Sequence, residues 1–289
     1  MTIMNGKALA EKIKKEIAEI VKSKNVAPRI ATVLVGEDPS SKTYVKLKRK
    51  DCQEVGIHFE VHELPEMTSE ERLLELIDEL NRRNDVHGII VQLPLPEHLD
   101  KRRVISRVEP AKDIDGLHPY NVGKLWLGMY DLNRDLLPCT PKGILKLIDS
   151  YEIELEGRRA VIINRSDLVG KPLSKLLLDR NSTVTLCHSR TREIEKHTRM
   201  ADVLVSAVGR RPHFVVTEDM VKEGAVVIDV GTNYVEGKLC GDVDFERVKR
   251  KASYITPVPG GVGPMTRAML LHNALIASEK IQTARTKES

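Results

Sequence analysis

The sequence predicts an α/β protein of two domains, each built on a parallel sheet. The chain has 289 residues, which is more than one domain of ordinary size requires. Short apolar runs alternate with longer amphipathic runs, as in a parallel sheet covered by helices. Residues 109–140 interrupt this alternation with an irregular stretch rich in Gly, Pro, Asp and Asn, which we interpret as the crossing between the domains.

The first domain is predicted from three strand-like runs and the helix-like runs between them. The opening segment, MTIMNGKALAEKIKKEIAEIVK, has the pattern of an amphipathic helix. After it, strands are expected at 30–36, 58–64 and 86–93, and helices at 40–55 and 69–83. The third strand ends at PLPEH, a loop at the carboxyl end of a strand, where ligands bind in open α/β sheets.

The second domain begins with a helix at 141–151. Its five expected strands are 158–164, 183–188, 202–208, 225–231 and 253–257. The last helix, 264–280, is strongly apolar, and the sharp PVPGGVG connection before it indicates that the helix packs back on the first domain. We therefore predict a first domain of 1–139 completed by 263–289, and a second domain of 140–262.

One lysine of the helix at 40–55 differs from the others. Each residue turns a helix by about 100°, so Lys42, Lys46 and Lys50 of the SSKTYVKLKRK stretch fall on one polar stripe. Lys48 instead falls on the inward face, one turn from Tyr44. A buried ammonium group is costly, so an inward lysine should have a lowered pKa and exchange protons near neutral pH. The alternative is that its amino group reaches solvent along apolar neighbours.

Composition excludes several other classes of function. The net charge of +4 is small and aromatic residues make up 3%, which lacks the basic and aromatic pattern of single-strand nucleic-acid binders. The four cysteines are scattered and form no pair at metal-ligand spacing. No apolar run approaches the roughly 18 residues of a membrane span, and the opening segment is not a signal peptide. We expect a cytoplasmic protein without metal, membrane or nucleic-acid partners.

Residues 160–180 predict a dinucleotide site. They read as strand, tight turn and helix, which places a pyrophosphate on a helix N-terminus. The turn, Asn164-Arg165-Ser166, lacks the GxGxxG pattern, but Asn tolerates a left-handed backbone. The next strand leads to Ser189 and Arg190, where an NAD site usually has an acidic residue. Hydroxyl and guanidinium groups suit a 2′-phosphate, so NADP is favoured over NAD, although Arg190 could equally be a surface charge.

Five stretches in order carry a family resemblance. They are YVKLK (44–48), VQLPLP (91–96), KDIDG (112–116), RSDLVGKP (165–172) and PVPGGVGPMT (257–266). Together they resemble the bifunctional, bacterial-type methylenetetrahydrofolate dehydrogenase/cyclohydrolase family over nearly the whole chain. The resemblance implies NADP-dependent oxidation of 5,10-methylenetetrahydrofolate to the methenyl form and hydrolysis of that product to 10-formyltetrahydrofolate. It also implies a folate-binding catalytic first domain, a Rossmann-like NADP-binding second domain, and a homodimer with its active-site cleft between the domains.

The same resemblance assigns roles to individual residues. Lys48 is the catalytic lysine and Gln92 supports it, Tyr44 stacks on the folate, and Asp115 binds the pterin end. These four are the catalytic candidates. The other residues expected at the folate are Val91, Leu93, Pro259, Gly260, Gly261 and Gly263. Those expected at the cofactor are Asn164, Arg165, Ser166, Ser189, Arg190 and Thr232.

Two positions depart from the family pattern, and other functions remain open on the residues alone. Asn164 stands where the family usually has Gly, and Thr232 where it usually has Ile. DIDG is also a common turn sequence, and the glycines at 260–263 would suit a plain hinge. The rival functions are an NADP dehydrogenase of another small substrate and a nucleotide-sensing module. Lys48 together with Tyr44, Gln92 and Asp115 argues against both of them, because a sensor has no need of a buried proton-transfer group.

Overall fold

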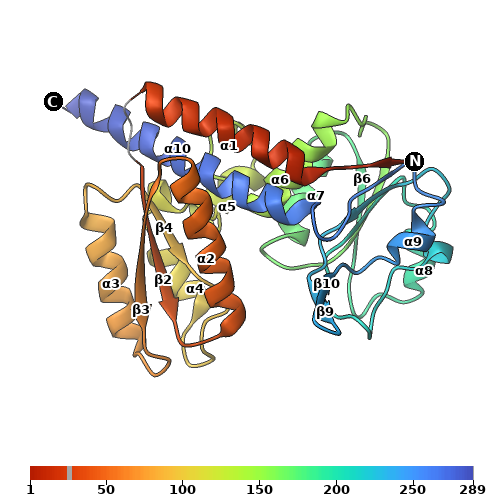
Figure 1. Ribbon diagram of the computed structural model, residues 1–289, viewed down its shortest axis with the longest axis horizontal. Coiled ribbons are helices and arrows are strands. Elements are labelled where there is room, and N and C mark those ends of the chain that lie inside the picture. Colours follow the sequence, from red (N-terminus) through yellow and green to blue (C-terminus); the bar gives the residue numbers. More distant parts are fainter. Residues whose placement is uncertain (25–27, 289) are drawn as a thin grey trace. The chain divides into compact units, whose positions relative to one another are not determined.

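The computed structural model describes residues 1–24 and 28–288, which form two compact units (Figure 1). The three-stranded unit contains Lys12–Cys139 and Arg267–Ser289, and the six-stranded unit contains Met1–Glu11 and Thr140–Thr266. The predicted α/β class with two parallel-sheet domains is confirmed. Residues 1–11, which the sequence places in the first domain, group with the six-stranded unit because a short strand there pairs with its sheet.

The sheet of the three-stranded unit has the order β3-β2-β4 and is entirely parallel. Its strands are β2 (Arg29–Val35), β3 (His58–Leu64) and β4 (Gly88–Val91). Its helices are α2 (Pro39–Glu54), α3 (Glu70–Arg82), α4 (Lys101–Arg107), η1 (Pro110–Lys112) and α5 (Pro119–Trp126). The chain adds β3 on one side of β2 and β4 on the other. The carboxyl ends of β2 and β4 therefore form a switch point, the usual ligand position in such sheets.

Apolar periodicity explains how α3 covers this sheet. Leu73, Leu76, Ile77 and Leu80 recur at three- and four-residue spacing and are all buried, which gives the helix one apolar face. They pack in one cluster with buried strand residues of β2 and β4. The helix begins at Ser69, whose hydroxyl accepts a hydrogen bond from a backbone N–H of the first turn.

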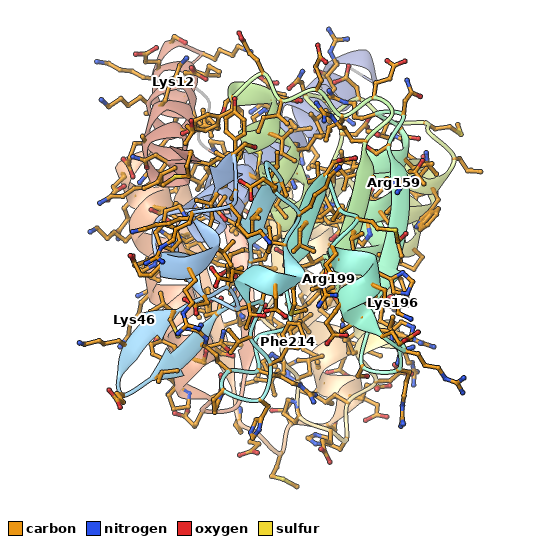
Figure 2. All side chains as sticks on the ribbon, turned by 90° about the vertical axis from the view of Figure 1, so that its right-hand side faces the viewer. Lys12, Lys46, Arg159, Lys196, Arg199 and Phe214 are labelled. Atoms are coloured by element: carbon orange, nitrogen blue, oxygen red, sulfur yellow. The ribbon has the colours of Figure 1, made fainter. Side chains whose placement is uncertain are left out.

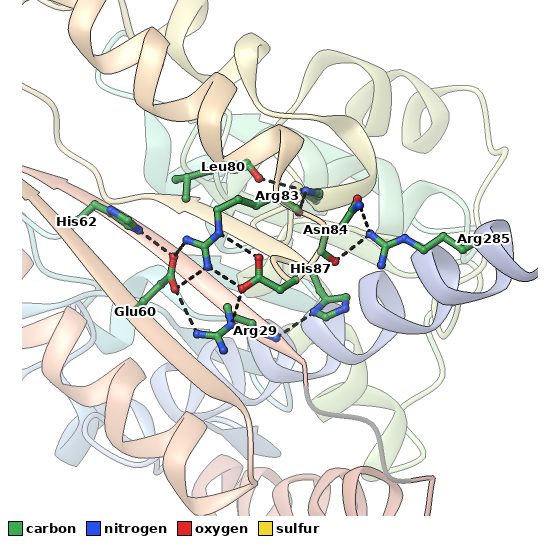
Figure 3. A network of polar contacts seen from close by, with 10 residues as sticks. Arg29, Glu60, His62, Leu80, Arg83, Asn84, His87 and Arg285 are labelled. Carbon is green, nitrogen blue, oxygen red and sulfur yellow. Dashed lines mark hydrogen bonds and ion pairs between the residues drawn. The ribbon is translucent and has the colours of Figure 1, made fainter.

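A polar network holds the amino-terminal edge of the same sheet (Figure 3). The Glu60 carboxylate on β3 binds Arg83 at 2.5 Å and Arg29 at 3.4 Å, and it contacts His62 Nε2 at 2.9 Å. Arg83 also donates to Asp85 at 2.7 Å. Because Arg83 follows α3 and Arg29 begins β2, this network ties a helix end to two strands at the edge opposite the switch point.

The six-stranded unit has a parallel sheet of order β1-β11-β8-β7-β5-β6. Its strands are β1 (Thr2–Ile3), β5 (Arg159–Ile163), β6 (Thr183–Cys187), β7 (Val203–Ser206), β8 (Val226–Asp229) and β11 (Tyr254–Ile255). The five predicted strands are present, each shorter than expected. The prediction of helix from residue 1 was wrong for β1, because a two-residue strand leaves no periodic signal. The hairpin of β9 (Asn233–Val235) and β10 (Lys238–Cys240) was also not predicted.

The six-stranded unit also has a switch point, which lies between its helices and strands. Its helices are α6 (Cys139–Ser150), α7 (Gly170–Leu178), α8 (Ile194–Thr198), η2 (Glu218–Met220) and α9 (Phe245–Val248). The chain adds β6 on one side of β5 and then β7 on the other. The carboxyl end of β5, followed by α7, is therefore where a dinucleotide binds in a doubly wound sheet. α7 is buried at seven of its nine residues, so it is a core helix of the unit.

Two long helices, α1 (Gly6–Ser23) and α10 (Val262–Glu288), contribute most of their residues to the three-stranded unit. Residues 6–11 and 262–266 of these helices group with the six-stranded unit. Within the three-stranded unit the two helices lie side by side (Figure 1), and Lys24 pairs with Glu279 at 2.6 Å. Asn273 of α10 donates to the carbonyl groups of Ile114 at 2.8 Å and Leu137 at 2.9 Å. The prediction that the last helix packs back on the first domain is confirmed. Within residues 1–24 and 28–288, no helix has the length and apolar character needed to cross a membrane.

Candidate active site

Lys48 on α2 forms a hydrogen bond to the residue that follows β4, at the switch point of the three-stranded sheet. α2 begins at Asp38, whose carboxylate accepts from the backbone N–H of Ser41 at 2.6 Å. One face of the helix is buried, and Lys48 lies half-buried beside it and donates to Gln92 Oε1 at 3.1 Å. Gln92 follows β4, is 9% exposed, and uses its Nε2 to donate to the carbonyl of Leu93. The amide is thus fixed with its oxygen toward the lysine.

Two of the other three lysines of α2 lie as the helical phase predicts, and Lys42 does not. Lys46 and Lys50 are exposed, and Lys46 projects into solvent (Figure 2). Lys42 is half-buried and pairs with the carboxylate of Glu37. Tyr44, the expected stacking residue, is 39% exposed, so its ring is available to a ligand.

A buried ion cluster holds α2 in this position. Asp51, one turn beyond Lys48, is 5% exposed and binds Arg267 Nε of α10 at 2.5 Å and Lys14 Nζ of α1 at 3.2 Å. Lys14 also binds Glu54 at 2.7 Å. Two cations from two helices therefore neutralise one buried carboxylate, which makes the cluster costly to break. The cluster cannot be identified from the sequence, because its members are far apart in the chain.

The loop that carries Asp115 is built by its neighbours in the KDIDG stretch. Lys112 is buried and donates to three carbonyl groups at the end of α3, those of Leu80 (3.1 Å), Asn81 (2.6 Å) and Arg83 (2.8 Å). These contacts fix the start of the loop on the three-stranded unit. This role of Lys112 was not predicted from the sequence.

Asp113 and Gly116 fix the rest of this loop. The Asp113 carboxylate accepts from the backbone of Leu117 at 3.1 Å and His118 at 2.8 Å, and from Asn121 Nδ2 at 2.8 Å. Gly116 has φ of 71°, and a Cβ there would lie 2.3 Å from the carbonyl carbon of Leu137. The glycine is required by both backbone and space.

Asp115 itself is half-buried and its electrostatics are coupled to Lys48. Burial raises the pKa of the Asp115 carboxyl, and the charge of Lys48 acts in the opposite direction. The structure therefore brings together Lys48, Gln92 and Asp115 within the three-stranded unit. Of the other expected folate residues there, Leu93 is half-buried, whereas the Val91 side chain packs in the core and leaves only its backbone for a ligand.

The expected folate residues 259–263 lie in the six-stranded unit. Gly260 has φ of 108°, and its carbonyl accepts from the backbone N–H of Lys7 at 2.8 Å. Gly261 is buried, with Pro257 O only 2.5 Å from the position of a Cβ. Pro259 and Gly263 are exposed, and no atom lies within 4 Å of a Cβ built on Gly263. The loop thus has a fixed base and an open outer surface.

Asn164 organises the expected cofactor turn after β5. Its Oδ1 accepts from Ser166 N at 2.7 Å, from Ser166 Oγ at 2.7 Å and from Gly170 N at 3.0 Å. Its Nδ2 donates to the carbonyl of Ala207, after β7, at 2.6 Å. A Cβ on Gly170 would lie 2.3 Å from Asn164 O. The asparagine therefore closes the turn with its side chain and needs no glycine at its own position.

The remaining cofactor candidates lie on loops at the carboxyl ends of the strands. Arg165 after β5, Ser189 and Arg190 after β6, and Thr232 after β8 are all exposed. The guanidinium groups of Arg165 and Arg190 and the hydroxyl of Ser189 lie on adjacent loops, and such groups suit a phosphorylated ribose. No cluster of three or more His, Cys, Asp or Glu side chains able to hold a metal occurs in the described residues.

Comparison with known proteins gives the family. Residues 4–115 match the tetrahydrofolate dehydrogenase/cyclohydrolase catalytic domain, and residues 138–282 match the NAD(P)-binding domain of the same family. A Francisella philomiragia protein named bifunctional protein FolD is 51% identical over 288 residues, covering 97% of this chain and 99% of that protein.

Solved structures agree with the sequence comparison. The FolD methylenetetrahydrofolate dehydrogenase/cyclohydrolase of Campylobacter jejuni has a TM-score of 0.92 and 49% identity, covering 97% of this chain and 99% of that one. The Trypanosoma brucei enzyme, solved with NADP and an inhibitor, has a TM-score of 0.90 and 38% identity, covering 97% and 98%. The chain belongs to the tetrahydrofolate dehydrogenase/cyclohydrolase family.

Proposed function

We propose that this protein oxidises 5,10-methylenetetrahydrofolate with NADP and hydrolyses the 5,10-methenyl product to 10-formyltetrahydrofolate. The observation that carries the proposal is the constellation of Lys48, Gln92 and Asp115 in the three-stranded unit, with Lys48 Nζ 3.1 Å from Gln92 Oε1. A dehydrogenase of another substrate, or a nucleotide sensor, has no evident use for this arrangement beside the exposed ring of Tyr44.

The hydrolytic half is assigned to Lys48. Adding water to the methenyl carbon and opening the ring both require protons to move, and a positioned amino group can accept and return them. Gln92 Oε1 holds one N–H of Lys48 and so orients its amino group. The oxidative half requires no such group, because the lone pair of the adjacent folate nitrogen drives the departure of the hydride.

Asp115 is assigned to the pterin end of the folate. A carboxylate can accept two N–H groups from the guanidine-like edge of a pterin in a bidentate contact. The charge of Lys48 favours the ionised form that this contact needs. Tyr44, Leu93 and the backbone of Val91 would supply the remaining contacts to the substrate from the three-stranded unit. The role of the loop at 259–263 stays a prediction from the family resemblance.

The cofactor is assigned to the carboxyl end of β5 and its neighbours. Bound NADP would supply the hydride acceptor. The backbone N–H groups at the start of α7 suit the pyrophosphate, while Arg165, Ser189 and Arg190 suit the 2′-phosphate. Asn164 and Ser166 shape the turn, and Thr232 lies on the loop after β8.

An absorbance assay tests both the reaction and the cofactor choice. The purified protein should reduce NADP faster than NAD at equal concentration when methylenetetrahydrofolate is supplied. Arg165→Ala should reduce this preference, whereas Arg158→Ala should leave it unchanged, because Arg158 is exposed and precedes β5, at the end opposite to Arg165. No reduction of either cofactor would overturn the proposed function, and activity with another hydroxy- or amino-acid substrate would favour the rival dehydrogenase.

The assembly and location are proposed from the family resemblance. We propose a homodimer that acts in the cytoplasm on small-molecule folate substrates. Light scattering at micromolar concentration should give twice the mass of one chain, and a monomer would contradict the dimer.

A further inference from the structure

Two buried carboxylates lie under the loops that follow β7 and β8. Asp242 is 0% exposed and Asp229 is 3% exposed. Neither forms an ion pair with a Lys or Arg in the part of the chain that the structure describes. Buried charges are rarely kept without a cation, so each must be stabilised by hydrogen bonds.

Asp242 binds two loops at once. Its Oδ2 accepts from Val208 N at 2.7 Å and from Ser206 Oγ at 2.8 Å. Its Oδ1 accepts from Gly209 N at 2.9 Å and from Asn233 Nδ2 at 3.1 Å. One carboxylate therefore joins the loop after β7 to the start of β9.

Asp229 fixes the backbone around Asp242 by hydrogen bonds. Its Oδ1 accepts from the backbone N–H groups of Gly231 at 2.9 Å and Asp242 at 3.0 Å, and its Oδ2 accepts from Val243 N at 2.9 Å. The carboxylate at the end of β8 thus fixes the backbone from which the second carboxylate projects.

Two glycines leave the space that these carboxylates occupy. A Cβ on Gly231 would lie 2.4 Å from Asp242 Cγ, and a Cβ on Gly241 would lie 1.9 Å from Asp229 Oδ2. Neither glycine has the positive φ that would require its residue type for backbone reasons. Their small size is therefore matched to the carboxylates.

The loop that Asp242 holds also contacts the cofactor turn. Ala207 O accepts from Asn164 Nδ2 at 2.6 Å, while the next two backbone N–H groups, of Val208 and Gly209, donate to Asp242. Thr232 lies immediately before Asn233, the other residue that Asp242 binds. The Asp242 carboxylate is thus hydrogen-bonded directly to both loops that face the proposed cofactor.

We propose that Asp242 is a positioning residue for the cofactor, which sets the mutual geometry of loops 207–209 and 231–233. The inference rests on the proposed function, since it takes the carboxyl ends of β5, β7 and β8 as the NADP site. Asp242 is not itself expected to touch substrate or cofactor. It acts through the backbone of Val208 and Gly209 and through Asn233.

The test is Asp242→Asn in the full-length protein, with NADP binding measured directly. An amide keeps the shape but turns an N–H₂ group toward N–H donors, so one loop must move. The Kd and KM for NADP should rise about 10- to 100-fold, as small misplacements of binding groups do. Hydrolysis of methenyltetrahydrofolate needs no cofactor and should stay within about twofold of wild type.

Three further variants make the result specific. Asp244→Asn alters a nearby carboxylate that makes no side-chain cap and pairs with Arg247 at 3.6 Å, and it should leave NADP binding unchanged. Gly231→Ala should reproduce the NADP defect, because its methyl group displaces Asp242. Val248→Ala should lower the stability of the same unit through its core, without a selective loss of NADP affinity.

The positioning role is overturned if Asp242→Asn binds NADP normally, or if Val248→Ala at equal loss of stability weakens NADP binding as much. It is also overturned if cofactor binding and methenyltetrahydrofolate hydrolysis fall together. A wild-type protein that binds NADP but cannot use methylenetetrahydrofolate would contradict the proposed function alone, because the positioning role is read from binding.

Discussion

At the scale of single residues, a hydrogen bond distinguishes Lys48 from the other lysines of its helix. All four lysines of α2 have the same chemistry, but only Lys48 donates to a strand-end amide whose orientation is fixed by a second hydrogen bond. An orienting partner is what general acid–base catalysis requires of a flexible amine.

Lys48→Met should therefore affect the two activities unequally. We expect the cyclohydrolase rate to fall by about 10²- to 10⁴-fold, the usual contribution of general acid–base catalysis. A measurable dehydrogenase rate should remain, so methenyltetrahydrofolate should accumulate and be visible by its near-ultraviolet absorbance. Lys46→Met, on the exposed face of α2, is the control and should retain both activities. Equal damage by the two substitutions would contradict the role of Lys48.

Asp115→Ala should weaken folate use far more than cofactor use. Loss of a charge-assisted, partly buried contact costs about 2–4 kcal/mol, or roughly 30- to 1,000-fold in kcat/KM for methylenetetrahydrofolate. Steady-state kinetics with each substrate varied in turn would measure this. A raised KM for NADP with an unchanged KM for folate would move Asp115 out of the pterin site.

Helical phase predicts that Lys48 faces inward, but it cannot predict the partner. Gln92 lies 44 residues away, and only the family resemblance placed it beside Lys48. The same limit applies to Asp242 and Lys112. The partners of Lys112 are backbone carbonyl groups at the end of α3, and two of the four partners of Asp242 are backbone N–H groups. Backbone groups carry no sequence signal.

At the scale of elements, the sequence predicted strands with consecutive apolar residues, such as β2 and β5, and the alternating HFEVHEL of β3. β2 and β5 were identified because buried parallel strands read as continuous apolar runs. β1 has two residues and β9–β10 is largely exposed, so neither shows a periodic pattern. Such elements are fixed by pairing with neighbours, which a single segment does not reveal.

One side chain of β2 lowers the stability of the unit to which it belongs. Thr32 is 0% exposed, and its hydroxyl has no hydrogen-bond partner within the described residues. Thr32→Val removes this buried polar atom while keeping the branched shape, so the unit should gain about 1 kcal/mol of unfolding free energy. Urea unfolding, followed by exchange of the β2 amide hydrogens, would measure it.

Thr256→Val provides the matched control. Thr256 is equally buried at 1% exposure, but its hydroxyl accepts from Asp229 N at 2.7 Å. The same substitution there should destabilise the protein. A loss of stability in Thr32→Val would mean that its hydroxyl has a partner in solution.

At the scale of the whole molecule, one carboxylate in each unit makes stability depend on pH, and the two act in opposite directions. In the three-stranded unit, burial of Asp135 opposes its ionisation, but Lys124 and Lys280 outweigh it and lower its pKa to about 2. This carboxylate stabilises the fold at neutral pH, and its contribution is lost as pH falls from about 4 towards 2. In the six-stranded unit, burial and the nearby charge of Asp242 raise the pKa of Asp229 to about 6.

The contribution of Asp229 to stability therefore changes with pH in the opposite direction. The native state binds the proton more tightly than the unfolded state, so stability is greatest below pH 4 for this group and declines as pH rises through about 6. The difference between the two pKa values corresponds to about 3 kcal/mol. Asp229→Asn cannot titrate and should lack this decline, whatever its overall loss of stability. The urea midpoints of wild type and Asp229→Asn, measured between pH 4 and 7, should move closer together as pH rises, because only the wild-type midpoint falls. Exchange of the β8 amide hydrogens gives the local readout. Parallel profiles would show that Asp229 is ionised throughout, held by its three backbone N–H donors.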